Sequence, residues 1–142
     1  MSQTALVRTT TELTYAGARV VLDACLAKAA EIGVPQCIVV VDSGGNLLAF
    51  ARMDGAKVLS QLSATQKAQT AASSRAATGA APQDFGVNLA LATGGRVTNL
   101  KGGLPIVKDG VVLGAIGIGS GTGDQDVTVA EAGIAALWQA LG

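Results

Sequence analysis

The sequence predicts an α+β fold in which helices pack on an antiparallel sheet built from two β-hairpins. Two pairs of short apolar segments, rich in β-branched residues, are each joined by a turn that contains glycine, which is typical of hairpins. The paired segments are 36–42 with 47–52, and 104–108 with 111–118. Segments with apolar residues at helical spacing precede, separate and follow the hairpins. This order favours an antiparallel α+β sheet over a parallel, doubly wound one.

A first helix is expected to begin at Thr9 and Glu12, which have the spacing of a capping box. Small and apolar residues then recur every three or four positions, as one face of a helix requires: Leu13, Gly17, Val20, Ala24 and Ala27. Gly33 and Pro35 end this helix. The first hairpin follows, with its two strands joined by the turn 43–46.

A second helix is expected from Ser60 or Ser63 to about Thr78, where glycine and proline are absent. Its repeating face is made of small residues: Ala64, Ala68, Ala71, Ala72 and Ala76. Such a face lets the helix axis approach a sheet or another helix closely. Gly79 and Pro82 end the helix.

Two more helices are expected at 84–92 and 124–141, on either side of the second hairpin with its Asp109-Gly110 turn. The glycine-rich loop 117–123 matches neither common nucleotide-binding motif. Asp124 and Asp126 would also place negative charge where a phosphate should lie, although they suit a helix N-terminus. We therefore interpret the loop as a strand-to-helix turn or as one wall of a small-molecule pocket.

Composition excludes several classes of function. The length of 142 residues fits one domain, 1–142, and the net charge of zero without a basic run argues against nucleic acid. No apolar run approaches the length of a membrane helix, so no membrane partner is expected and the chain is predicted to be cytoplasmic. Histidine is absent, and Cys25 and Cys37 alone cannot complete a zinc site, so no metal site is expected. A content of 49% hydrophobic and 14% charged residues predicts a homo-oligomer.

Lys67 and Arg52 are the candidate catalytic residues. Lys67 lies among the small residues of the second helix, where its ammonium group could contact a carboxylate or a ligand; a solvated lysine is the alternative. Arg52 ends the second strand and could bind a ligand carboxylate with both arms of its guanidinium group. Pairing of Arg52 with Asp42 or Asp54 is the structural alternative.

Five segments, taken in order, carry a family resemblance. They are Val41-Asp42-Ser43-Gly44-Gly45-Asn46-Leu47-Leu48, Arg52-Met53-Asp54-Gly55-Ala56, Ala64-Thr65-Gln66-Lys67-Ala68-Gln69-Thr70-Ala71, Gly102-Gly103-Leu104-Pro105-Ile106, and Gly114-Ala115-Ile116-Gly117 followed by a glycine loop and Asp126. Together they resemble the GlcG/HbpS family over residues 10–141. The resemblance implies a profilin- or PAS-like α+β sandwich that assembles into homo-oligomers.

The resemblance also implies a small-molecule pocket. We predict it between the helix that carries Lys67 and two glycine turns, with an organic acid or a tetrapyrrole as the ligand. The predicted ligand-binding residues are Asp42, Thr70, Arg96, Gly102, Gly103, Gly119, Ser120 and Gly121.

Haem is implied as a cofactor by the resemblance alone, because some relatives bind it, commonly through histidine. This chain has no histidine, and Asn46 stands where many relatives have one. Tyr15, Met53, Cys25 and Cys37 remain as chemically possible axial ligands. We therefore expect no cofactor.

Three functions remain open on the sequence. The first is a small-molecule binding protein of the GlcG/HbpS kind. The second is a cofactor-free lyase or isomerase, in which Arg52 or Arg96 holds a small carboxylate substrate and Lys67 or an acidic residue moves a proton. The third is a structural oligomer without a ligand.

Overall fold

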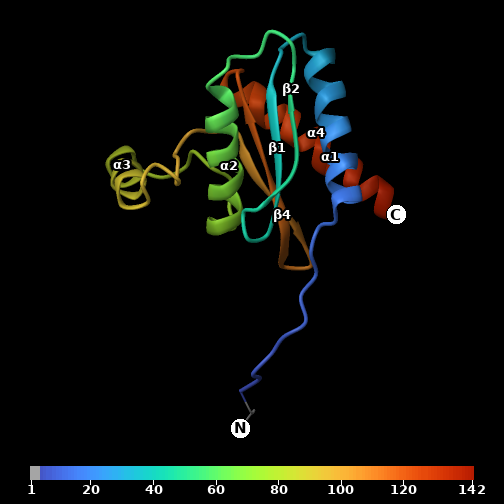
Figure 1. The fold of residues 1–142 in the computed structure, drawn as a ribbon, viewed down its shortest axis with the longest axis vertical. Helices are drawn as coiled ribbons and strands as arrows, with labels where there is room; N and C mark the ends of the chain where they lie inside the picture. The colour runs from blue at the N-terminus through green and yellow to red at the C-terminus, as the bar shows by residue number, and fades with distance from the viewer. Residues whose placement is uncertain (1–3) are drawn as a thin grey trace.

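The computed structural model describes residues 4–142 and has four antiparallel strands in the order β2-β1-β4-β3 (Figure 1). The strands are β1 (Cys37–Asp42), β2 (Leu47–Arg52), β3 (Gly103–Lys108) and β4 (Val111–Gly119). The helices are α1 (Tyr15–Glu31), α2 (Ser60–Ser74), α3 (Gln83–Ala92) and α4 (Gly123–Leu141). The two hairpins pair through β1 and β4 at the centre of the sheet. The predicted α+β class is confirmed.

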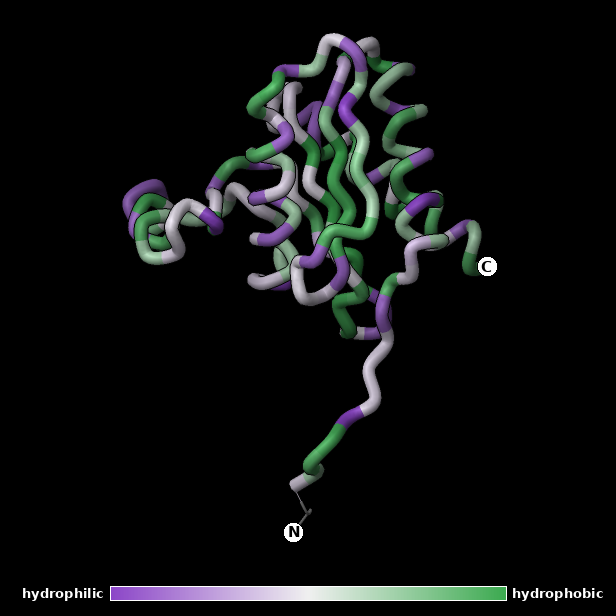
Figure 2. The backbone as a smooth tube through the Cα atoms, in the orientation of Figure 1, coloured by the Kyte–Doolittle hydropathy of each residue, from purple (hydrophilic) through white to green (hydrophobic). Residues whose placement is uncertain are grey.

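The sheet separates two apolar layers, as the alternation of side chains along β1 requires. Ile38 and Val40 face α1 and α4, whereas Val39 and Val41 face α2. Figure 1 shows α2 on one side of the strands and α1 with α4 on the other. Figure 2 shows the strongest hydrophobic colouring along the central strands, between these layers.

Helix α2 packs unusually close to the sheet, because alanine on the helix meets glycine on the strands. A Cβ atom added at Gly117 would collide with the carbonyl oxygen of Ala64, and one added at Gly103 would collide with that of Lys67. At Gly119 an added Cβ would lie 3.0 Å from the Ser60 carbonyl oxygen. The small-residue face predicted for this helix therefore lies directly on a glycine-lined part of the sheet.

Two predicted helix boundaries were wrong. Helix α1 begins at Tyr15 rather than near Thr9, because Thr14 is the residue whose side chain accepts the free Gly17 N–H, at 3.0 Å. Helix α2 ends at Ser74 rather than Thr78, because Arg75 takes a left-handed conformation with φ 58°. A complete capping box is formed instead at the start of α4.

Helix α3 projects from the body of the molecule (Figure 1). Gly86 is its one buried residue, against the side chain of Asn99. Among residues 4–142, no helix is both long enough and apolar enough to span a bilayer.

Candidate functional site

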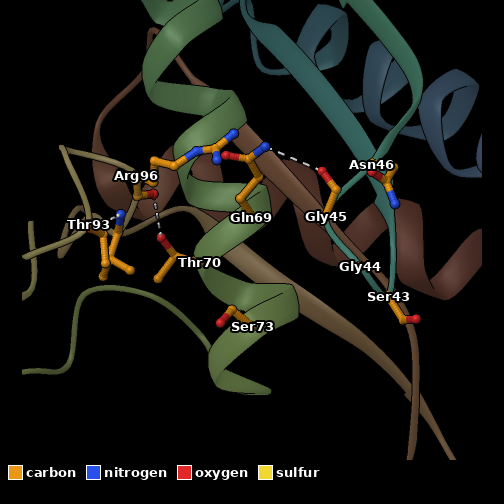
Figure 3. Close-up of a pocket in the computed structure, with 10 residues that line it drawn as sticks. Ser43, Gly44, Gly45, Asn46, Gln69, Thr70, Ser73, Thr93 and Arg96 are labelled. Atoms are coloured by element: carbon orange, nitrogen blue, oxygen red, sulfur yellow. Dashed lines mark hydrogen bonds between the residues drawn. The ribbon is translucent and has the colours of Figure 1, made fainter.

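A cavity of about 580 Å³ lies over the outer face of α2, between the β1–β2 turn and the segment that follows α3. Its wall is mostly polar and consists of Ser43, Gly44, Gly45, Asn46, Gln69, Thr70, Ser73, Thr93, Arg96 and Val97. Figure 3 shows the turn on one side of α2 and Arg96 reaching across the helix towards Gln69 from the other. We call this space the Arg96 cavity.

The β1–β2 turn forms one side of this cavity and is held by Asp42. One carboxylate oxygen of Asp42 accepts the main-chain N–H groups of Gly44 and Asn46, each at 2.9 Å. The Asn46 side-chain amide donates to the same carboxylate at 3.1 Å. Asp42, predicted as a ligand-binding residue, therefore acts in this structure as the acceptor that shapes the turn.

Two neighbouring residues of α2 hold the other parts of the cavity in place. The amide nitrogen of Gln69 donates to the Gly45 carbonyl at 3.3 Å, which ties the turn to the helix. The hydroxyl of Thr70 donates to the Arg96 carbonyl at 3.4 Å and accepts the Thr98 N–H at 3.0 Å. Thr70 is buried. It fixes the main chain from which the Arg96 side chain projects (Figure 3).

Arg96 gives the cavity a positive charge that its own wall does not neutralise. No aspartate or glutamate lines the cavity. Within residues 4–142 the Arg96 guanidinium group takes part in no hydrogen bond or ion pair, and only its main-chain groups are bonded. The hydroxyl of Ser73 is a second group in the wall without a partner among these residues. An anion is the chemical species that such a wall can hold.

Lys67 lies on another side of α2, inside the protein. Its ammonium group donates to Asp126 Oδ2 at 2.8 Å and to the Ile118 carbonyl at 2.7 Å. Asp126 also accepts from Gln36 Nε2 at 2.8 Å and from the Gly121 N–H at 3.1 Å. Burial raises the pKa of the Asp126 carboxyl, and the bond from Lys67 opposes that shift.

The glycine turns predicted to bind ligand lie around this buried ion pair or under α2. A Cβ atom at Gly102 would lie 2.8 Å from Asp126 Cβ, and one at Gly121 would lie 2.8 Å from Asp126 Oδ1. Gly103 and Gly119 meet the main chain of α2. Ser120 accepts the Lys57 N–H at 3.0 Å. None of these five residues lines a described cavity.

Arg52 is also separate from the cavity. It ends β2, whereas the turn that lines the cavity precedes the start of that strand. Five residues of extended chain lie between Asn46 and Arg52, which corresponds to about 20 Å along the strand. Of the predicted site residues, the structure therefore brings Thr70 and Arg96 together and leaves Lys67 and Arg52 elsewhere.

Sequence reasoning did not single out Gln69, Ser73 and Thr93 as site residues. Gln69, Thr70 and Ser73 share one face of α2 at positions i, i+1 and i+4, opposite the alanines that contact the sheet. The helical spacing of these three polar residues could have identified this face from the sequence. Thr93 had no such signal, since only the fold brings the segment after α3 back over α2.

Comparison of the sequence with models of known protein families gives a match that covers most of the chain. The model of the family described as haem degrading protein HbpS-like matches residues 13–135. This chain belongs to the HbpS-like family. The resemblance drawn from the five segments is thereby confirmed.

Individual relatives extend over most of the chain. A 15.0 kDa Citrobacter freundii protein encoded between dhaT and dhaS is 40% identical over 124 residues, which cover 84% of this chain and 87% of that protein. The crystal structure of Klebsiella pneumoniae protein ORFY has a TM-score of 0.88 and 30% identity, covering 96% of this chain and 98% of ORFY. A crystal structure of a PduOC:haem complex has a TM-score of 0.81 and 28% identity, covering 89% of this chain and 95% of the PduOC chain.

The haem complex raises the question whether this HbpS-like chain has residues that fit haem. The wall of the Arg96 cavity contains no tyrosine, methionine or cysteine. Cys25 is buried and donates to the Val129 carbonyl, and Met53 Sδ accepts the Gln36 N–H, each away from the cavity. Asn46 is present in the wall, but a neutral amide that already binds Asp42 is not one of the usual axial ligands. The residues present do not fit an iron-bound haem in this cavity.

Proposed function

We propose that this protein binds a small organic acid in the Arg96 cavity. The observation that carries the proposal is the Arg96 guanidinium group, which lies at a polar cavity without a carboxylate partner. A guanidinium group presents paired N–H donors whose spacing matches a carboxylate, and such charge-assisted bonds are about twice as strong as neutral ones. The HbpS-like relatives support small-molecule binding in general.

The cavity suits a ligand of modest size. Its volume of about 580 Å³ lies within the usual range for small-molecule sites. The Ser73 hydroxyl and the free oxygen of the Gln69 amide add hydrogen-bonding groups to the same wall. We infer that Arg96 binds the acid and that these two groups contact other polar atoms of the ligand.

Binding accounts for the geometry better than proton transfer by Lys67. A lysine base needs a free electron pair and access to the substrate. Lys67 is 5% exposed and its ammonium group is bonded to Asp126 and Ile118. A lyase or isomerase mechanism through Lys67 therefore receives no support from this arrangement.

Binding of butyrate, measured by titration calorimetry or by NMR shifts, tests the proposal. Arg96→Gln removes the charge and should weaken binding about 10- to 100-fold, since a hydrogen bond to a charged group contributes about 1.5–3 kcal/mol. Arg96→Lys keeps the positive charge but lacks the planar guanidinium group, so its affinity for butyrate should lie between those of the parent and Arg96→Gln. Arg19→Gln, on α1, is the matched control and should bind like the parent. Equal binding by the parent and Arg96→Gln would refute the proposal.

We further propose that the chain forms homo-oligomers in which α3 contacts a second copy. A helix of 10 residues is unstable in water without packing, yet α3 leaves large apolar side chains exposed. They include Phe85, Val87 and Leu91, with Leu100 nearby in sequence. Light scattering after size exclusion should give a mass above that of one chain. Val87→Glu with Leu91→Glu should reduce that mass, and a monomeric parent at micromolar concentration would contradict the proposal.

A further inference from the structure

A second cavity continues from the Arg96 cavity. It has a volume of about 440 Å³ and shares Ser43 and Ser73 with the first. Its remaining wall comes from the segment before α1, the end of α2 and the β3–β4 turn: Arg8, Thr9, Thr10, Thr11, Ala72, Arg75, Gly110, Val111 and Val112. The two cavities therefore adjoin at Ser43 and Ser73, and we call them together the groove.

The far end of this groove is also positively charged. Arg8 and Arg75 line the second cavity, and no aspartate or glutamate does. Neither side chain has a hydrogen bond or ion pair within residues 4–142. The nearby Glu12 carboxylate accepts both the N–H and the hydroxyl of Ser43. Free positive groups thus line both cavities. Where the cavities adjoin, the Ser43 hydroxyl is bonded to Glu12 and the Ser73 hydroxyl has no partner among these residues.

The main chain at Arg75 has a positive φ angle, which is uncommon for residues other than glycine. Three residues other than glycine have positive φ in the described chain: Arg75 at 58°, Asp109 at 51° and Ser120 at 90°. Asp109 lies in an Asp-Gly hairpin turn, which requires that conformation, and Ser120 uses its hydroxyl to accept the Lys57 N–H.

Arg75 takes its positive φ at the C-terminus of a helix instead. It follows the last residue of α2, where glycine is the residue that adopts a left-handed conformation without strain. Its main-chain N–H bonds the Ala71 carbonyl, which any residue except proline could do. Arginine at this helix end therefore carries some backbone strain, and its side chain lines the second cavity without a partner among residues 4–142.

We propose that the groove binds a dicarboxylate, with one carboxylate at Arg96 and the other at Arg75 and Arg8. This proposal rests on the proposed function and extends it to a class of ligand. A monocarboxylate would engage one end of the groove. A dicarboxylate of sufficient length would engage both ends, and its chain would pass Ser43 and Ser73.

A chain-length series of probes tests the class of ligand. Succinate, adipate and pimelate would be compared with butyrate and hexanoate at constant ionic strength. We expect at least one dicarboxylate to bind tenfold or more tightly than the monocarboxylate of similar length. Dicarboxylates that bind no better than monocarboxylates would overturn the proposal.

Substitution of Arg75 separates this proposal from the first one. Arg75→Gly removes the charge and the backbone strain together, so dicarboxylate affinity should fall about tenfold or more while butyrate affinity and the melting temperature do not fall. Arg75→Asn, which also tolerates a left-handed conformation, should give the same loss if the glycine variant folds poorly. Unchanged dicarboxylate affinity in both variants would overturn the groove but leave the Arg96 site intact. If Arg96→Gln changes the binding of no probe, the proposed function itself fails.

Discussion

The Lys67 ammonium group lies 2.8 Å from the Asp126 carboxylate, and the two side chains come from residues 59 positions apart. Both are nearly excluded from solvent, at 6% and 1% exposure. Gly102 and Gly121 leave the space that the pair occupies. The contact joins α2 to the start of α4 beside the end of β4, so it belongs to the structure of the core rather than to the ligand site.

Removing one partner of this ion pair should strongly destabilise the fold. Lys67→Met leaves the Asp126 carboxylate buried without its cation, and we expect a loss of about 3–5 kcal/mol in the free energy of unfolding, measured with urea. Lys101→Met is a matched control, because its pair with Asp124 is exposed to solvent and should contribute little to stability. In a double-mutant cycle with Asp126→Asn, the two losses should not add. A Lys67→Met protein as stable as the parent would contradict this role.

The glycine-lined contact under α2 should tolerate no side chain. In Gly117→Ala the new Cβ would meet the main chain of α2 at Ala64, which cannot rotate away. We expect a melting temperature lower by about 10 °C or more, since overpacking costs about 1–3 kcal/mol and a clash with main chain costs more. Gly44→Ala is the comparison, because its nearest neighbour is the movable end of the Asn46 side chain, at 3.0 Å. Similar melting temperatures for the two variants would show that the helix is less closely packed.

Both thiols should be unreactive in the folded protein. Burial raises the pKa of the Cys25 thiol to about 12 and also raises that of Cys37. The thiolate is the reactive form, so at pH 8 each group stays almost fully protonated. Mass spectrometry after iodoacetamide treatment should find neither residue modified under native conditions and both modified in 6 M guanidinium chloride. Rapid native labelling of either cysteine would show that the core opens at that position.

Haem binding should depend on restoring a ligand at the turn. The parent protein should give no Soret shift typical of an axially ligated haem when haemin is added, because the cavity wall lacks a suitable side chain. Asn46→His places an imidazole in that wall and should give such a shift. Asn46→Gln is the control and should behave like the parent. A ligated spectrum from the parent would point to Tyr15, Met53 or a cysteine as the ligand.

The sequence by itself determined the secondary structure and the class of fold. The apolar, β-branched runs of β1 and β4, the Asp109-Gly110 turn and the alanine spacing of α2 are local signals, and local backbone preferences act on them directly. The close approach of α2 was predictable because alanine at helical spacing leaves room for it. The start of the first helix did not follow from local signals, since Thr9 and Thr14 both offer a capping hydroxyl and the structure uses Thr14.

Only the tertiary structure decided which polar residues share a site. Lys67 and Thr70 are three positions apart on one helix, yet one is buried against Asp126 and the other holds the segment that carries Arg96. The pairing of β1 with β4 and the return of the chain after α3 determine these neighbours, and both are contacts between residues distant in sequence. A side chain's type states what it can bind, but its partners depend on where the fold places the rest of the chain.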